Sequence, residues 1–178
     1  MTRATSSVLF LLAVLCAFAT PAAAQGGSGF YGPVTAYGQP TQVFSANPFG
    51  LIFDFYNFEY EVKVADSITT GAGASRRGWI LFGESQEKPR LNGDVFVRYY
   101  PGGSAFNGLA LGLKVGLTKL PRDGTFTGIG FDLNQSHAVT DHLVVSGGIG
   151  TKRLLGYRGG LFDSPSITTL RLNIGLGF

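Results

Sequence analysis

The sequence predicts an all-β fold, an antiparallel up-and-down β-barrel of eight strands. Apolar residues alternate with small or polar residues in stretch after stretch of the chain, and this is the period of a β-strand. Only 14% of the 178 residues are charged while 44% are hydrophobic, and 27 are glycine. An ordinary soluble domain carries about 25% charged residues, so a standard water-exposed surface is not expected.

The alternation places the strands in order along the chain. The clearest strand is 108–120, in which bulky aliphatic residues occupy every odd position from Leu109 to Leu117. The first strand has the weakest alternation and is expected within 37–46. The other seven strands are expected at 51–63, 67–76, 91–100, 108–120, 125–138, 142–153 and 165–178.

Two stretches of the chain resemble each other, namely 57–68 and 132–143. Each reads as a strand, a tight turn and a glycine-rich returning strand. The turns are expected at Ala65 and Asp66 in the first stretch, and at Thr140 and Asp141 in the second. The similarity predicts two hairpins of the same construction.

The first 24 residues have the pattern of a secretory signal peptide. Arg3 gives a positive start, residues 8–19 form an apolar run, and small residues precede a cleavage site after Ala24. We therefore expect a signal peptide at 1–24, a glycine-rich leader at 25–36 and a barrel at 37–178. The one cysteine, Cys16, lies in the signal peptide, so no disulfide framework is expected in the barrel.

The composition of the second face of each strand favours a barrel that crosses a membrane. This face consists mainly of Gly, Ala, Thr and Asn, whereas a soluble barrel would need Lys and Glu there. The alternative is a soluble, lipocalin-like binding barrel with its aliphatic face inward. Aromatic residues near one rim agree with interfacial girdles of a membrane barrel, and they are Tyr60, Tyr99, Tyr100, Phe106 and Phe178.

Three motifs carry a resemblance to a known family. The last strand alternates apolar residues and ends at the aromatic Phe178, and two short motifs stand at 47–61 and 98–100. The chain resembles the small bacterial outer-membrane β-barrel proteins, in particular a group with no assigned function. The resemblance implies a location in the bacterial outer membrane, contact with its lipid, and delivery by the barrel-assembly machinery, for which Phe178 is the expected assembly signal.

The inner faces of the predicted strands carry charges of both signs. Because an unpaired charge in a narrow interior is costly, we expect these side chains to neutralise one another and fill the lumen. The protein is then a non-enzymatic barrel with a structural or surface-contact role, and the alternative is a porin-like, narrow channel for small solutes. The expected lumen network consists of Glu59, Glu61, Asp94, Arg98, Lys114, Asp132 and Arg171.

No catalytic, metal or cofactor site is expected. His137 and His142 form neither a metal-ligand motif nor the His-x-Ser motif of outer-membrane deacylases. A formal charge of +3 without a clustered basic face argues against a nucleic-acid partner. Segments 76–90 and 155–164 are expected as outer loops, and lipopolysaccharide is a candidate partner through four cations of the first of these, namely Arg76, Arg77, Lys88 and Arg90.

Overall fold

The structure is a computed structural model of the chain, and it describes residues 39–49, 54–77, 89–121, 123–157 and 166–178. The signal peptide expected at 1–24 and the leader expected at 25–36 lie outside the described residues. Lys88 and most of the two expected outer loops do so as well. No helix in the described part of the chain has the length and apolar character of a membrane span.

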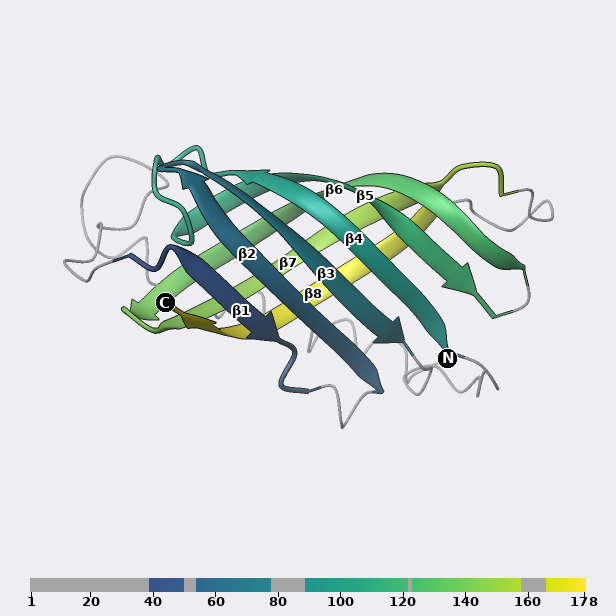
Figure 1. Cartoon of the computed structure of the whole chain (residues 1–178), viewed down its shortest axis with the longest axis horizontal. Helices are drawn as coiled ribbons and strands as arrows, with labels where there is room; N and C mark the ends of the chain where they lie inside the picture. The colour runs from purple at the N-terminus through teal and green to yellow at the C-terminus, as the bar shows by residue number, and fades with distance from the viewer. Residues whose placement is uncertain (1–38, 50–53, 78–88, 122, 158–165) are drawn as a thin grey trace, which may run out of the picture. The chain divides into compact units, whose positions relative to one another are not determined.

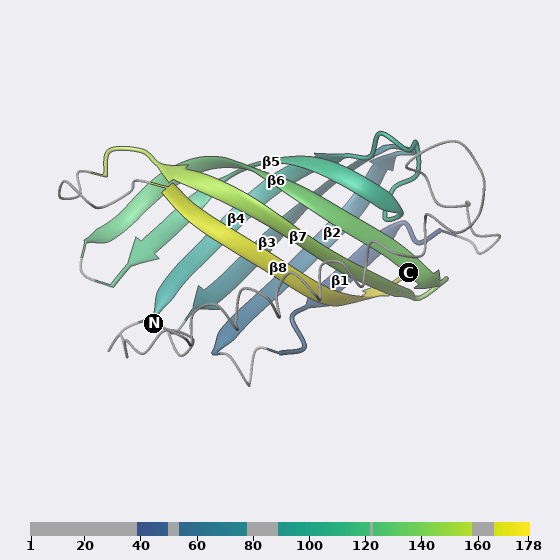
Figure 2. The same cartoon turned by 180° about the vertical axis from the view of Figure 1, so that it is seen from behind.

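Eight antiparallel strands close into one barrel, in which each strand pairs with its neighbours in sequence and the last pairs with the first. Figures 1 and 2 show the strands following one another around the barrel from both sides. This confirms the predicted fold class. The strands are β1 (Gln42–Ala46), β2 (Phe55–Ala65), β3 (Ile68–Arg77), β4 (Arg90–Tyr99), β5 (Gly108–Leu120), β6 (Gly124–Thr140), β7 (Leu143–Leu154) and β8 (Ser166–Gly177).

The strands are strongly staggered. Leu176 of β8 pairs with a residue of β1, that residue pairs with one of β2, and so on around the barrel. This path of paired residues comes back to β8 at Ser166, ten residues from its start (176 − 166). For eight strands such a stagger corresponds to a tilt of about 40°, and the strands do run obliquely in Figure 1. Each residue along a strand therefore advances ~2.5 Å along the barrel axis, and each step to the next strand shifts the height by ~3 Å.

The observed strand ends differ from the expected ones by a few residues. The largest difference is in β2, expected from residue 51 but beginning at Phe55. Asp54, directly before it, has a φ of 47°, a left-handed conformation that does not fit a strand. Residues 51–53 are outside the described part of the chain.

The two hairpins predicted from the internal similarity have the same irregularity at the same place. The register shifts between Lys63 and Ala65 in one hairpin, and between Ala138 and Thr140 in the other. In both, the shift lies next to a tight turn, at residues 66–67 and 141–142. The turns therefore fall one residue later than expected, because the bulge lengthens β2 and β6.

Glycines on the inner face make room for long side chains from other strands. A side chain on Gly112 would meet the carboxylate of Asp132 and the aliphatic part of Arg98, and one on Gly128 would meet Lys152. The glycines of the inner face thus leave the space that the long charged side chains of the same face occupy. The barrel can be filled because several inner-face glycines lie against the long side chains of neighbouring strands.

Replacing Gly130 by alanine should destabilise the barrel by about 1–3 kcal/mol. The added methyl group would lie against the backbone carbonyl of Thr151 and 2.8 Å from the Cα atom of Lys152, neither of which can move without shifting β7. Gly93 faces outward with nothing within 4 Å of an added Cβ, so Gly93→Ala is the matched control and should be neutral. Urea titration of the two variants, folded in detergent micelles, measures the difference. Equal midpoints would contradict this packing.

Candidate functional site

The charged side chains of the lumen come from six strands and meet near the middle of the barrel. Period-two alternation turns Glu59 and Glu61 of β2 inward, and likewise Asp94 and Arg98 of β4. Lys114 of β5 and Asp132 of β6 are buried by the same pattern. With Arg171 of β8, all seven side chains predicted for the lumen network therefore point into the barrel.

Arg98 is the centre of the cluster and is only 1% exposed. Its guanidinium donates to a carboxylate oxygen of Glu61 and, at 2.9 Å, to one of Glu59. Its Nε lies 3.7 Å from Asp132 Oδ1, and its charged carbon lies 4.0 Å from the centre of the Phe96 ring. One buried cation thus faces three carboxylates and an aromatic ring.

Arg171 supplies the second positive charge to the same carboxylates. Its Nε lies 2.5 Å from Glu59 Oε1, and its Nη1 donates to Asp132 Oδ2 at 3.0 Å. Arg98 and Arg171 therefore share Glu59 and Asp132, so that two cations and two anions alternate around a closed ring. Such an alternating arrangement offsets much of the cost of removing the four charges from water.

A second cluster includes a residue that the sequence analysis missed. Lys152 of β7 is fully buried, and its Nζ donates to Asp94 Oδ1 at 2.6 Å. Lys114 Nζ donates to the hydroxyl of Thr169 at 3.0 Å. With Lys152 the network holds four carboxylates and four cations, so its formal charge is zero: Glu59, Glu61, Asp94, Asp132, Arg98, Lys114, Lys152 and Arg171.

Neutral polar groups complete the network. Glu61 accepts hydrogen bonds from the hydroxyls of Thr69 and of Tyr100, the latter at 3.2 Å. The amide of Asn57 donates to Asn173 Oδ1 at 3.1 Å, which links β2 to β8 across the interior. These buried groups find partners within the protein rather than in water, as a stable interior requires.

Apolar clusters lie at both ends of the polar network. The cluster at the end near Phe178 includes Tyr100 and Phe106, whose rings lie 6.4 Å apart, together with Val43, Ala105, Ala110, Ala138 and Val144. At the other end Leu120, Leu154 and Ile167 pack with Phe126 and Tyr157. Between them a cavity of about 40 Å³ is lined by Glu59, Lys114 and Arg171, among others. It has room for a few water molecules.

The prediction that Tyr100 and Phe106 belong to an outward aromatic girdle is wrong. Both are buried inside the barrel. Tyr100 continues the inward parity of Arg98, and Phe106 is turned inward by a segment in which it has a φ of 60°. Ala105 anchors this segment by donating its backbone N–H to the carbonyl of Asp66 at 2.7 Å. Tyr60, Tyr99 and Phe178 do face outward.

The expected outer-loop cations are also placed differently. Arg76 and Arg77 end β3 and Arg90 begins β4, so all three belong to strands. Arg76 faces outward, whereas Arg77 and Arg90 are paired across the strands at the mouth of the lumen. The His142 ring lies at the opposite rim, with Nδ1 3.1 Å from the Gly177 carbonyl oxygen. No metal-binding group of three or more His, Cys, Asp or Glu residues occurs among the described residues.

The chain matches no family model, no curated protein and no solved structure.

Proposed function

We propose that the protein is a non-enzymatic barrel embedded in the bacterial outer membrane, with a side-chain-filled lumen and a structural or surface-contact role. The observation that supports this most strongly is the outer face of the barrel. Large apolar side chains cover it, and Leu113 near its centre is 72% exposed. An exposed apolar surface of this extent needs a covering, and lipid is a covering that fits all sides of a barrel.

The distribution of charge on this outer face supports the same proposal. On the described strands, the outward-facing charged residues are Arg76, Lys119 and Arg153, all near one end. The uncharged face of β4 from Leu91 to Tyr99 spans eight residue steps, or ~20 Å along the barrel axis. This is close to the ~25 Å apolar band of outer-membrane barrels.

The two alternatives fit less well. A soluble binding barrel would hold apolar side chains inside around a ligand, whereas this lumen holds eight charged side chains that neutralise one another. A narrow channel would need a continuous water path, whereas the described interior has the 40 Å³ cavity between two apolar clusters. A filled lumen favours a structural or surface-contact role for the protein over solute transport.

The proposal is tested by gel mobility and conductance. Folded membrane barrels resist SDS, so the protein from the detergent-extracted outer-membrane fraction should migrate differently before and after boiling. In a planar bilayer the same preparation should show rare, brief openings. Recovery from the soluble periplasmic fraction without a mobility shift would overturn the membrane assignment, and steady conductance would replace the structural role by the channel.

Deleting Phe178 should lower the amount of folded protein in the outer membrane several-fold. Phe178 is exposed on the outer face, and its backbone N–H donates to the Gln42 carbonyl at 3.0 Å. Phe178→Tyr keeps both the aromatic ring and the backbone contact, so it serves as the matched control. Quantitative immunoblotting of membrane fractions measures the effect. If the deletion variant accumulates at the control level, Phe178 is no assembly signal.

A further inference from the structure

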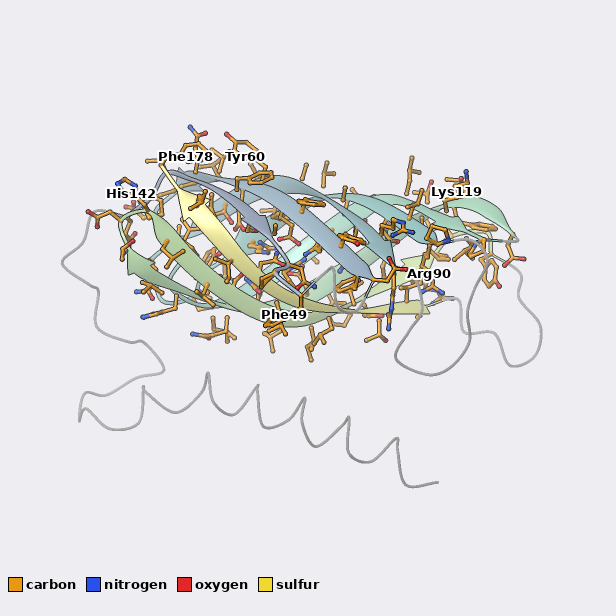
Figure 3. The ribbon with its side chains drawn as sticks, turned by 90° about the horizontal axis from the view of Figure 1, so that it is seen from below. Phe49, Tyr60, Arg90, Lys119, His142 and Phe178 are labelled. Carbon is orange, nitrogen blue, oxygen red and sulfur yellow. The ribbon has the colours of Figure 1, made fainter. Side chains whose placement is uncertain are left out.

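Three outward-facing cations lie near one another in height at the end of the barrel opposite Phe178. Arg76 is on β3, Lys119 on β5 and Arg153 on β7, so one occurs on every second strand. In the register Leu91 of β4 pairs with both Arg76 and Lys119. We call Arg76, Lys119 and Arg153 the cationic belt. Figure 3 shows Lys119 far from the end that holds Phe178, Tyr60 and His142.

The stagger of the strands brings the belt to one level. Residue pairing leads from Arg76 through Leu91 to Lys119, which is two strands away. These two strand steps place Lys119 ~6 Å from Arg76 along the barrel axis. Arg153 is two strands further, but it pairs with Ile129, which lies four residues further along β6 than Thr125, the partner of Lys119, and so further from the belt end. That step returns it to within ~3 Å of the height of Arg76. The belt therefore occupies a layer ~6 Å deep.

Arg76 is held in place on the outer surface. Its guanidinium lies 5.6 Å from the centre of the Tyr56 ring and donates to Asp54 Oδ1 at 2.6 Å. Its side chain is nevertheless 45% exposed. Among the described residues the carboxylate of Asp54 accepts from Nη1 alone, so the remaining N–H donors of the fork can meet a second anion from solvent or lipid.

Charge differs between the two ends of the described barrel. The belt end also holds Arg77, Arg90, Asp54 and Asp123, which gives five basic and two acidic residues with the belt. The end with the short turns holds Lys63, Asp66 and Asp141, one basic and two acidic residues. The belt end therefore favours an anionic partner, and the opposite end does not.

Each belt cation stands beside an exposed aliphatic side chain. Leu91, next to Arg76 and Lys119, is 41% exposed, and Ile129, next to Arg153, is 56% exposed. A free phosphate ion would use only the cations. An amphiphile with phosphate groups and acyl chains would use both the cations and the apolar wall directly below them.

We propose that the cationic belt binds the phosphate groups of a lipid in the adjoining membrane leaflet. The inference rests on the proposed function, because it needs a barrel that spans the membrane. Arg76 would donate hydrogen bonds to phosphate oxygens, and Lys119 and Arg153 would pair with phosphate charge. In an outer membrane the phosphorylated lipid A of the outer leaflet has this chemistry, and the belt end of the barrel then faces outward.

The test measures lipid binding to the full-length protein folded in detergent micelles, by native mass spectrometry. The probes are bisphosphorylated lipid A, the same lipid after dephosphorylation, and inorganic phosphate. The wild type should bind the bisphosphorylated lipid far more tightly than the other two probes. The variant R76Q/K119Q/R153Q should bind it on the order of a hundredfold more weakly, at about tenfold or less per cation.

The matched control is R77Q/R90Q, which removes two cations from the lumen mouth at the same end and leaves the outer face unchanged. Its affinity for the bisphosphorylated lipid should stay within about threefold of the wild type, whereas each belt cation contributes up to about tenfold. Loss of binding in this control alone would move the site to the mouth and overturn the belt. Equal binding of the dephosphorylated lipid would overturn it without any substitution, even if the triple variant folded poorly.

The experiments distinguish a wrong proposal for lipid binding by the belt from a wrong proposal for the membrane barrel. The heat-dependent gel shift and insertion into lipid vesicles are measured first on the wild type. Absence of both defeats the membrane barrel and the belt together. Normal insertion with no preference for phosphorylated lipid overturns the belt alone.

Discussion

Replacing Arg98 by methionine should destabilise the barrel by about 3–5 kcal/mol, because it leaves buried carboxylates without their cation. Arg98 faces Glu59, Glu61 and Asp132, all of them buried. Methionine retains much of the aliphatic volume, so the loss reports on charge more than on a cavity. The free energy of unfolding is measured by urea titration in micelles.

Two further variants identify the cause of the loss. Lys119→Met removes a cation from the exposed outer face and should change the stability by less than about 1 kcal/mol. Adding Glu61→Gln to the Arg98→Met variant should restore part of the lost stability, since one uncompensated charge is then gone. If Arg98→Met is as stable as Lys119→Met, the ion pairs of the lumen contribute little to folding.

In the proposed membrane barrel, replacing Leu113 by arginine should block or severely reduce membrane insertion, at a cost of about 2–4 kcal/mol for a charge near the bilayer midplane. Leu113 is the most exposed of the large apolar side chains described. In a water-exposed barrel the same substitution would remove an exposed aliphatic group and would be tolerated. Its effect therefore depends on what covers the outer face.

Thr125→Arg provides the control at the belt end. Thr125 faces outward beside Lys119. In the proposed membrane barrel an added cation there would lie near the membrane surface and should cost at most about 1 kcal/mol. Insertion of the refolded variants into vesicles, followed by the heat-dependent gel shift, compares the two. Normal insertion of Leu113→Arg would mean that this face does not meet lipid.

The strands and their faces could be predicted from the sequence because alternation is a local property. The aliphatic residues at the odd positions from Leu109 to Leu117 can be assigned to one face from this segment alone, without knowing which strands lie beside it. The start of β2 could not be predicted, since it depends on the left-handed conformation of Asp54. Phe106 was misplaced for a related reason, because a turn with a positive φ directs it into the barrel.

Alternation predicts which residues face the lumen, but it does not predict which of them form ion pairs with one another. Lys152 was missed although it shares the parity of Gly148 and Gly150, the small residues of the same inner face. Tyr100 shares the parity of Arg98 and could have been placed inside by the same rule. Which carboxylate meets which cation depends on the ten-residue stagger of the closed barrel, and no single strand contains that information.

The seam between β1 and β8 determines when the barrel can close. β1 has five residues and pairs with β8 over four, and the seam is completed by hydrogen bonds between Phe178 and Gln42. Strands so distant in sequence can meet only after β8 has been synthesised, so the ring cannot be completed on a growing chain. Until the seam forms, β1 and β8 are the open edges of a sheet with an apolar outer face, and such edges are prone to pair with other chains. The barrel therefore keeps open sheet edges until its shortest strand, β1, pairs with β8.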